Sequence, residues 1–92
     1  MTVPTVERQV TIVNPLGLHA RPAAQFVRLA NSFASDILIS KDGLDVNGKS
    51  IIGVMMLAAE CGSIIAIRAT GDDAEFAVEA LAELVAGGFG EA

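Results

Sequence analysis

Hydrophobic and polar residues alternate along four short stretches of the chain, which is the pattern of half-buried β-strands. These stretches are residues 6–13, 36–41, 44–47 and 63–70. In the first, Val10 and Ile12 fall on one side of the strand and their polar neighbours on the other. Asp42 and Gly43 separate the second and third stretches, and this dipeptide is a strong signal for a hairpin turn. We therefore expect four strands, two of them joined as a hairpin.

Two segments between these strands have the period of a helix. The first begins at Ala20 and carries an apolar stripe at Phe26, Leu29, Ala30 and Phe33. The second follows Ser50, a residue type favoured at a helix N-cap, and extends toward Gly62. Each of these helices is expected to connect two strands of the sheet.

A third helix is expected near the end of the chain, where Asp72 and Glu75 fit a capping box. Gly87 and Gly88 then stop it. One side of this helix is acidic, with Glu75, Glu79 and Glu83. The side assigned to the core consists of Phe76, Ala77, Ala80, Leu81, Leu84 and Val85.

The resulting order, β-α-β-β-α-β-α, indicates one α+β domain over residues 1–92. Strands with a single apolar face need helices on that face only, so the expected architecture is a two-layer sandwich. The order is equally compatible with a ferredoxin-like split βαβ unit that carries an extra helix. Periodicity does not determine the order of the strands in the sheet. A chain of this size is expected to be a monomer.

The composition narrows the class of partner. Of the 92 residues, 52% are hydrophobic, so the chain is expected to fold around an aliphatic core. The net charge of −5 argues against nucleic acid and against an anionic membrane surface as ligands. The basic residues Arg21, Arg28 and Lys49 nevertheless lie near the histidine and serine segments described below, which favours a small anionic group or an acidic partner.

Several other kinds of site are not expected. Cys61 is the only cysteine, and with a single histidine the chain has no recognisable metal-ligand cluster, so neither a metal nor a cofactor is predicted. The N-terminus lacks the pattern of a signal peptide. The longest apolar run, residues 51–59, is too short to span a bilayer. We expect a cytoplasmic protein.

The candidate chemistry lies in residues 14–26, NPLGLHARPAAQF, which contain the only histidine. Proline is tolerated only in the first turn of a helix, so Pro22 places His19 at or beside the N-cap. The backbone N–H groups of Ala20 and Arg21 then have no acceptor within the helix. Together with the helix dipole and the Arg21 guanidinium, they form a site for an anion next to the imidazole. A neutral imidazole in such a cradle can accept a phosphoryl group and release it.

The second helix presents more apolar surface than one sheet face can cover. Residues 51–59 contain no charged or strongly polar side chain. Val54 and Leu57 share one side and can serve the core. The other two sides carry Ile51 with Met55 and Ile52 with Met56. One sheet face cannot cover all of them, so we expect part of this surface, with Ile51 and Met55, to be exposed as a docking surface for other proteins.

Two motifs connect these features to a known family. The segment GLHARPA, residues 17–23, resembles the active-site segment of the HPr family, the histidine-containing phosphocarriers of the bacterial phosphotransferase system. The segment NGKSIIGVMML, residues 47–57, resembles the regulatory-serine segment of the same family. The element order and the length agree as well, so the resemblance covers essentially the whole chain. Ala58 is a departure, because the family often has glycine at the end of this helix.

The resemblance implies the fold and the function. The fold would be an open-faced sandwich with three helices on one face of a four-stranded antiparallel sheet. His19 would be phosphorylated on Nδ1 by enzyme I, which draws on phosphoenolpyruvate, and would pass the group to an EIIA domain or protein. Arg21 would pair with the phosphate and Pro22 would lie beside it. Such a protein is a covalent intermediate in sugar transport rather than a turnover enzyme.

The resemblance also implies a regulatory site and partners. Ser50 would be phosphorylated by an HPr kinase/phosphorylase, which would add negative charge to the docking surface. That surface, which would bind enzyme I, EIIA and a regulatory protein, is assigned to Ile51, Ile52, Met55, Arg28 and Lys49.

Other functions remain open at this point. The chain can be a regulatory docking protein, controlled at Ser50, rather than a sugar-uptake carrier, although such a protein would not need His19 and Arg21. A ferredoxin-like ligand- or metal-binding module is disfavoured by the lack of a ligand cluster. Within the family, the serine segment looks closer to the sugar branch than to the nitrogen-related branch.

Overall fold

The computed structural model describes residues 3–91 and contains one four-stranded sheet. Its strands are β1 (Thr5–Thr11), β2 (Asp36–Lys41), β3 (Leu44–Asn47) and β4 (Ile64–Thr70). They lie in the order β1-β4-β2-β3, and all three neighbouring pairs are antiparallel. The last strand in sequence is thus inserted between the first and the second. The four predicted strands are confirmed to within two residues at each end.

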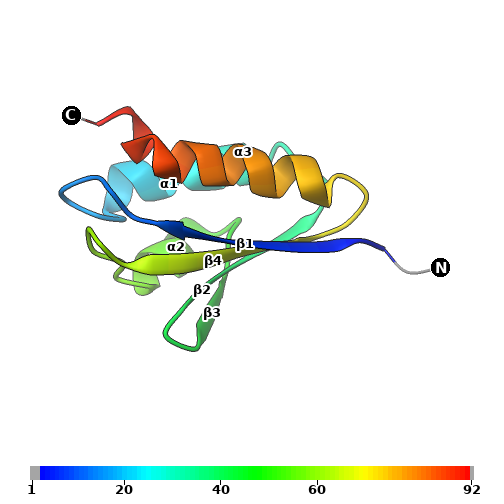
Figure 1. Cartoon of the computed structure of the whole chain (residues 1–92), viewed down its shortest axis with the longest axis horizontal. Helices are drawn as coiled ribbons and strands as arrows, with labels where there is room; N and C mark the ends of the chain where they lie inside the picture. Colours follow the sequence, from blue (N-terminus) through cyan, green and yellow to red (C-terminus); the bar gives the residue numbers. More distant parts are fainter. Residues whose placement is uncertain (1–2, 92) are drawn as a thin grey trace.

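The helices are α1 (Ala20–Ala30), α2 (Ile51–Met56) and α3 (Ala74–Ala86), followed by a short 3₁₀ turn, η1 (Gly88–Gly90). Helices α1 and α3 contact each other and lie over one face of the sheet, as Figure 1 shows. Helix α2 contacts α1 and β3, near the other edge of the sheet. The predicted order and the open-faced α+β sandwich are confirmed.

The core is aliphatic and lies between the sheet and the two longer helices. Along β4, Ile65, Ile67 and Ala69 are fully buried, and the residues that alternate with them are exposed or half-buried. This alternation means that only one face of the sheet is covered. Phe26 of α1 is the largest fully buried side chain. Among the described residues, no helix is long and apolar enough to cross a membrane.

The predicted capping box of the third helix is wrong. The N-cap of α3 is Asp73, and its side chain makes no capping hydrogen bond. Its carboxylate instead accepts hydrogen bonds from the backbone N–H groups of Ala34 and Ser35, at 2.8 and 2.9 Å, and from the Ser35 hydroxyl. The tertiary fold brings these three donors to the start of α3, where they replace the local donors that a capping box would use.

The core-facing side of α3 also differs from the prediction, because Phe76 is 73% exposed. Helix α3 packs on β1 and β4 with a set of buried residues that shares only Ala77, Leu81 and Val85 with the predicted one. The buried residues are Ala74, Ala77, Val78, Leu81, Ala82 and Val85. The helix is apolar on more than one side, so periodicity alone fits several rotations about its axis. Small alanines at the contact let the helix approach the sheet closely, and this packing turns Phe76 outward.

Helix α2 is shorter than predicted. It ends at Met56 instead of continuing toward Gly62, with Leu57 as its C-cap. Ala58 has a positive φ of 49°, a left-handed conformation that ends the helix. The chain then carries Ala59, which is 3% exposed, into contact with the loop that precedes α1. The end of α2 is therefore set by this contact and not by the next glycine.

Candidate functional site

His19 occupies the N-cap of α1, as the position of Pro22 predicts. Ala20, Arg21 and Pro22 form the first turn of the helix, and the ring of Pro22 is buried. The backbone N–H groups of Ala20 and Arg21 have no intrahelical acceptor, and the His19 side chain does not cap the helix. These two donors, at the positive end of the helix dipole, can therefore hold an anion beside the imidazole.

The loop that precedes His19 is held tightly against the segment after α2. Gly17 has a φ of +66°, and a Cβ there would overlap the carbonyl oxygen of Ala59 and lie 2.9 Å from Cα of Glu60. The N–H of Leu18 donates to the same carbonyl at 2.9 Å. Within the loop, the Asn14 side-chain amide donates to the carbonyl of Gly17 at 2.7 Å. Glycine is thus required at position 17, and the loop has little freedom to move.

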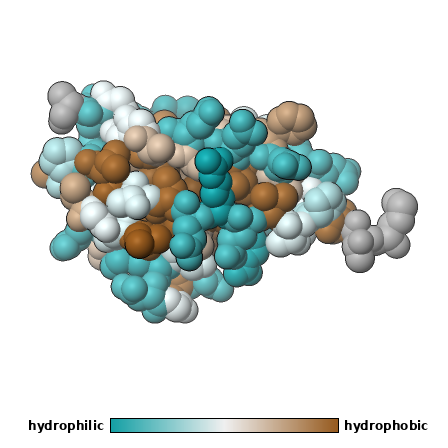
Figure 2. Space-filling model, viewed as in Figure 1, coloured by the Kyte–Doolittle hydropathy of each residue, from teal (hydrophilic) through white to brown (hydrophobic). Residues whose placement is uncertain are grey.

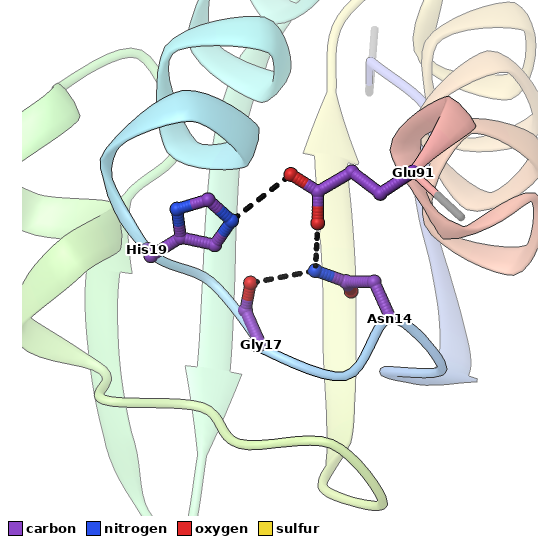
Figure 3. A network of polar contacts seen from close by, with 4 residues as sticks. All are labelled: Asn14, Gly17, His19 and Glu91. Atoms are coloured by element: carbon purple, nitrogen blue, oxygen red, sulfur yellow. Dashed lines mark hydrogen bonds and ion pairs between the residues drawn. The ribbon is translucent and has the colours of Figure 1, made fainter.

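Glu91 lies against the histidine ring, although nothing in the sequence analysis assigns it a role. Its Oε2 is 2.9 Å from Nε2 of His19, and its Oε1 accepts a hydrogen bond of 3.0 Å from Nδ2 of Asn14. Figure 3 shows the carboxylate between these two side chains, with the second ring nitrogen, Nδ1, turned away from Glu91. The side chain of Glu91 is 19% exposed and that of His19 35%, so the pair is partly shielded from water.

The conformation of the segment after α3 brings Glu91 back toward His19. Gly88, Phe89 and Gly90 all have positive φ values, of 65°, 57° and 72°, so the chain curls sharply after α3. The side chain of Phe89 is 4% exposed and belongs to the hydrophobic core. Two glycines therefore permit the curl and one buried aromatic residue anchors it. A run of glycines around a single aromatic residue, followed by an acid, is the only trace of this arrangement in the sequence.

Arg21 is exposed and lines a shallow hollow together with Glu91, the residue that contacts the His19 ring. The hollow has a volume of about 540 Å³ and is also lined by Pro15, Leu16, Gln25, Phe89 and Gly90. Arg21 and Pro22 follow His19 in the first turn of α1, and the structure places Glu91 against the ring and Asn14 against Glu91.

The exposed apolar surface predicted for the second helix is present. Ile51 is 44% exposed, Ile52 73% and Met55 43%, whereas Val54 is fully buried and Leu57 is 4% exposed. Helix α2 contacts α1, the helix that begins at His19. Figure 2 shows further apolar residues gathered on the half of the molecule that holds the loop between β1 and α1. Exposed apolar side chains of that loop include Val13 and Leu16.

The three polar residues predicted to act beside α2, Ser50, Lys49 and Arg28, differ in their contacts. Ser50 is the N-cap, as predicted, and its hydroxyl oxygen accepts a hydrogen bond of 3.1 Å from the N–H of Gly53. The ammonium of Lys49 donates to the carbonyl of Phe33 at 2.8 Å and so ties this turn to the segment that follows α1. Arg28 is exposed in the last turn of α1. Among residues 3–91, no group of three or more His, Cys, Asp or Glu side chains is placed to hold a metal ion.

Comparison with known proteins shows the family to which the chain belongs. Residues 6–87 match the family model described as PTS HPr component phosphorylation site. The chain belongs to the HPr family. It is 46% identical to phosphocarrier protein HPr of Cupriavidus necator over 86 residues, which are 94% of this chain and 97% of that protein.

Two further comparisons bear on the structure and on the branch of the family. A crystal structure of HPr from Thermoanaerobacter tengcongensis has a TM-score of 0.91 and 46% identity, over 95% of this chain and 98% of that one. The HPr-like protein Crh of Halalkalibacterium halodurans is 53% identical over 76 residues, which are 83% of this chain and 90% of that protein. HPr proteins are phosphocarriers of the phosphotransferase system and not turnover enzymes, so the ferredoxin-like ligand-binding alternative is excluded.

Proposed function

We propose that His19 accepts a phosphoryl group from enzyme I, which draws it from phosphoenolpyruvate, and passes it to an EIIA domain or protein. The observation that carries this proposal is the position of His19 at the N-cap of α1, beside two unpaired N–H groups. Phosphoryl transfer depends mainly on positioning and on stabilisation of charge, and both are available there. The chain acts in this relay as a single-domain monomer in the cytoplasm.

The residues around His19 have distinct roles in this proposal. The backbone N–H groups of Ala20 and Arg21 donate hydrogen bonds to the phosphoryl oxygens. The guanidinium of Arg21, an exposed residue two positions after His19, pairs with the remaining negative charge. Pro22 fixes the backbone of the first turn, because its ring holds φ near the helical value. No metal or cofactor takes part.

Partner proteins bind the exposed side of α2 next to this site. Ile51, Ile52 and Met55 supply the apolar contact, and the flexible methionine lets one surface fit both enzyme I and EIIA. Arg28 is a solvent-exposed cation on the adjacent helix and pairs with acidic groups of the partner. Lys49 contributes positive charge close to Ser50, although its ammonium is also bonded to the carbonyl of Phe33.

Ser50 is the proposed regulatory site, modified by an HPr kinase/phosphorylase. Its hydroxyl accepts one hydrogen bond from the N–H of Gly53, and a phosphate oxygen can accept the same bond. The phosphate adds about two negative charges next to Ile51 and Ile52 without removing the cap. Docking of acidic partners is therefore reduced while the fold persists.

Intact-mass spectrometry tests the relay directly. Wild-type protein and the His19→Ala variant are incubated with phosphoenolpyruvate and an enzyme I that is known to charge another HPr. The expected result is one phosphoryl group on the wild type, lost in acid, and none on the variant. Phosphorylation of the variant would refute the assignment of His19, and an unmodified wild type would refute the carrier function with that enzyme.

A regulatory docking protein is the second candidate, because the chain is also similar to an HPr-like protein named Crh. In that case Ser50 would be the main site of modification and a regulatory protein the main partner. The presence of His19 with Arg21 favours the carrier, since a purely regulatory protein has no need of them. A separate question is whether the chain belongs to the sugar-related or the nitrogen-related branch of the family. Assays of phosphoryl transfer to a sugar-type and to a nitrogen-type EIIA protein answer it, and we expect transfer to the sugar type.

A further inference from the structure

We infer that Glu91 is a positioning residue for phosphoryl transfer: it keeps the proton of His19 on Nε2, so that Nδ1 presents its lone pair. This inference deepens the proposed function and rests on it. The inference is based on the hydrogen bonds that link Asn14, Glu91 and His19. The Glu91 carboxylate bridges the Asn14 amide and the His19 ring, at distances of 3.0 and 2.9 Å. A carboxylate accepts hydrogen bonds only, so the ring nitrogen that faces it must carry the proton.

The orientation of the Asn14 amide supports this assignment. Asn14 is 2% exposed, and its Nδ2 lies between two acceptors, the carbonyl of Gly17 and Oε1 of Glu91. A flipped amide would place its oxygen against both acceptors, so the donor orientation is the only one that the surroundings allow. Asn14 therefore holds the carboxylate in place from the side opposite the ring.

The conformation of the backbone before Glu91 indicates that the fold specifically supports the Glu91–His19 contact. Gly88, Phe89 and Gly90 adopt left-handed conformations one after another, and a left-handed conformation is unfavourable for a phenylalanine. The buried ring of Phe89 holds the curled segment against the core. The result of this strained path is that Glu91 reaches His19, which is 72 positions earlier in the chain.

The tautomer matters for the chemistry at Nδ1. In the Nε2–H form, the Nδ1 lone pair forms the N–P bond while the bond between phosphorus and the donor breaks and its electron pair leaves with the donor. The ring keeps its Nε2 proton and becomes positively charged, and the Glu91 carboxylate balances that charge. On transfer onward, the N–P electron pair returns to Nδ1 and the ring is neutral again. No proton has to move in either step.

The Glu91→Gln variant gives a sharp test, because Asn14 dictates how the new amide is oriented. The amide oxygen must face the Asn14 donor, so the amide NH₂ faces Nε2 of His19. That nitrogen must then accept a hydrogen bond, and the proton moves to Nδ1. Nitrogen-15 NMR of the His19 ring is expected to show mainly Nε2–H in the wild type, mainly Nδ1–H in Glu91→Gln, and a mixture in Glu91→Ala.

The initial rate of phosphorylation by enzyme I is measured on the same samples. We expect it to fall about tenfold in Glu91→Gln, the size of a lost hydrogen bond to a charged group, and less in Glu91→Ala. Glu79→Gln, on the exposed side of α3, removes the same charge away from the ring and serves as the control. Thermal unfolding of each variant identifies a merely structural effect.

The outcomes separate this inference from the proposed function. If the wild type is phosphorylated and Glu91→Gln reacts at the same rate, or keeps the Nε2–H tautomer, the positioning role of Glu91 is refuted and the carrier function stands. If the wild type itself is not phosphorylated by an active enzyme I, the proposed function fails, whatever the tautomer of the ring.

Discussion

At the scale of single residues, the site depends on a glycine whose neighbours leave no room for a side chain. Gly17 combines a positive φ with close contact to the backbone of Ala59 and Glu60. The same contact joins the loop before His19 to the segment after α2. Gly17 thus allows the loop before His19 to pack closely against the segment after α2.

Replacing Gly17 by Ala tests this role. A Cβ would meet backbone atoms that cannot move aside, and the left-handed conformation adds strain of its own. We expect a loss of about 3 kcal/mol in the free energy of unfolding, measured with urea, and slower phosphorylation of His19. Gly43→Ala is the matched control, because Gly43 also has a positive φ but a Cβ added there would meet nothing within 4 Å. It should lose only about 1 kcal/mol.

Ala58 makes the opposite case, since it takes a left-handed conformation without being a glycine. Ala58→Gly removes strain of about 1–2 kcal/mol and adds about 0.4–1 kcal/mol of entropy to the unfolded chain. The variant should therefore be more stable by about 0.5–1 kcal/mol, seen as a higher midpoint of thermal unfolding. Ala80→Gly, inside α3, should lose about 1 kcal/mol instead. A decrease for both variants would contradict the strain at Ala58.

At the scale of elements, α2 has more apolar side chains than its contacts with the rest of the fold can cover. Val54 and Leu57 face the core, and the isoleucines and methionines around them remain accessible. Exposed apolar groups of this kind are typical of surfaces that bind other proteins, which agrees with the proposed docking role. The short helix is held by its Ser50 cap and by packing of Val54 rather than by its own propensity.

Met55→Glu separates docking from folding. Met55 is 43% exposed, so the stability of the variant should change by less than about 1 kcal/mol, while its affinity for enzyme I should fall at least about tenfold. Isothermal titration calorimetry measures the affinity. Val54→Ala, at a fully buried position, should show the reverse, with a loss of about 2 kcal/mol of stability and little change in affinity. A large loss of stability in Met55→Glu would show that Met55 belongs to the core.

At the scale of the whole molecule, two long-range polar contacts join segments that are distant in sequence. Glu91 connects the segment after α3 to the start of α1, and Asp73 connects the start of α3 to the loop that follows α1. The Ser35 hydroxyl and the N–H of Ala34 lower the pKa of Asp73 below its ordinary value of 3.8. Both contacts place a carboxylate against donors supplied by another element.

The lowered pKa of Asp73 predicts how stability depends on pH. A carboxylate whose pKa is depressed in the folded state stabilises the protein above the unfolded pKa, and this stabilisation is lost as pH falls through the folded pKa. Urea unfolding of the wild type and of Asp73→Asn should therefore differ at pH 6, and the difference should shrink as the pH falls below 3.8 and through the lowered pKa of the folded state. Asp72→Asn, at the exposed neighbouring position, is the control and should follow the wild type. A constant difference at all pH values would contradict the assignment.

The features that depend on neighbouring residues alone can be predicted before the fold is known. Alternation predicted the strands, Asp42-Gly43 the hairpin, Ser50 the cap of α2, and Pro22 the position of His19 at a helix start. These are local effects, because steric limits on φ, the missing N–H of proline and short-range hydrogen bonds act within a few residues. The two motifs added the family resemblance, which the comparisons confirm.

Which distant residues meet depends on how the helices pack on the sheet. The insertion of β4 between β1 and β2, the rotation of α3 that exposes Phe76 and the early end of α2 all depend on packing across the core. The local pattern permits several solutions in each case, and burial selects one of them. The same holds for Glu91, which reaches His19 only because the buried Phe89 and two glycines turn the chain back after α3.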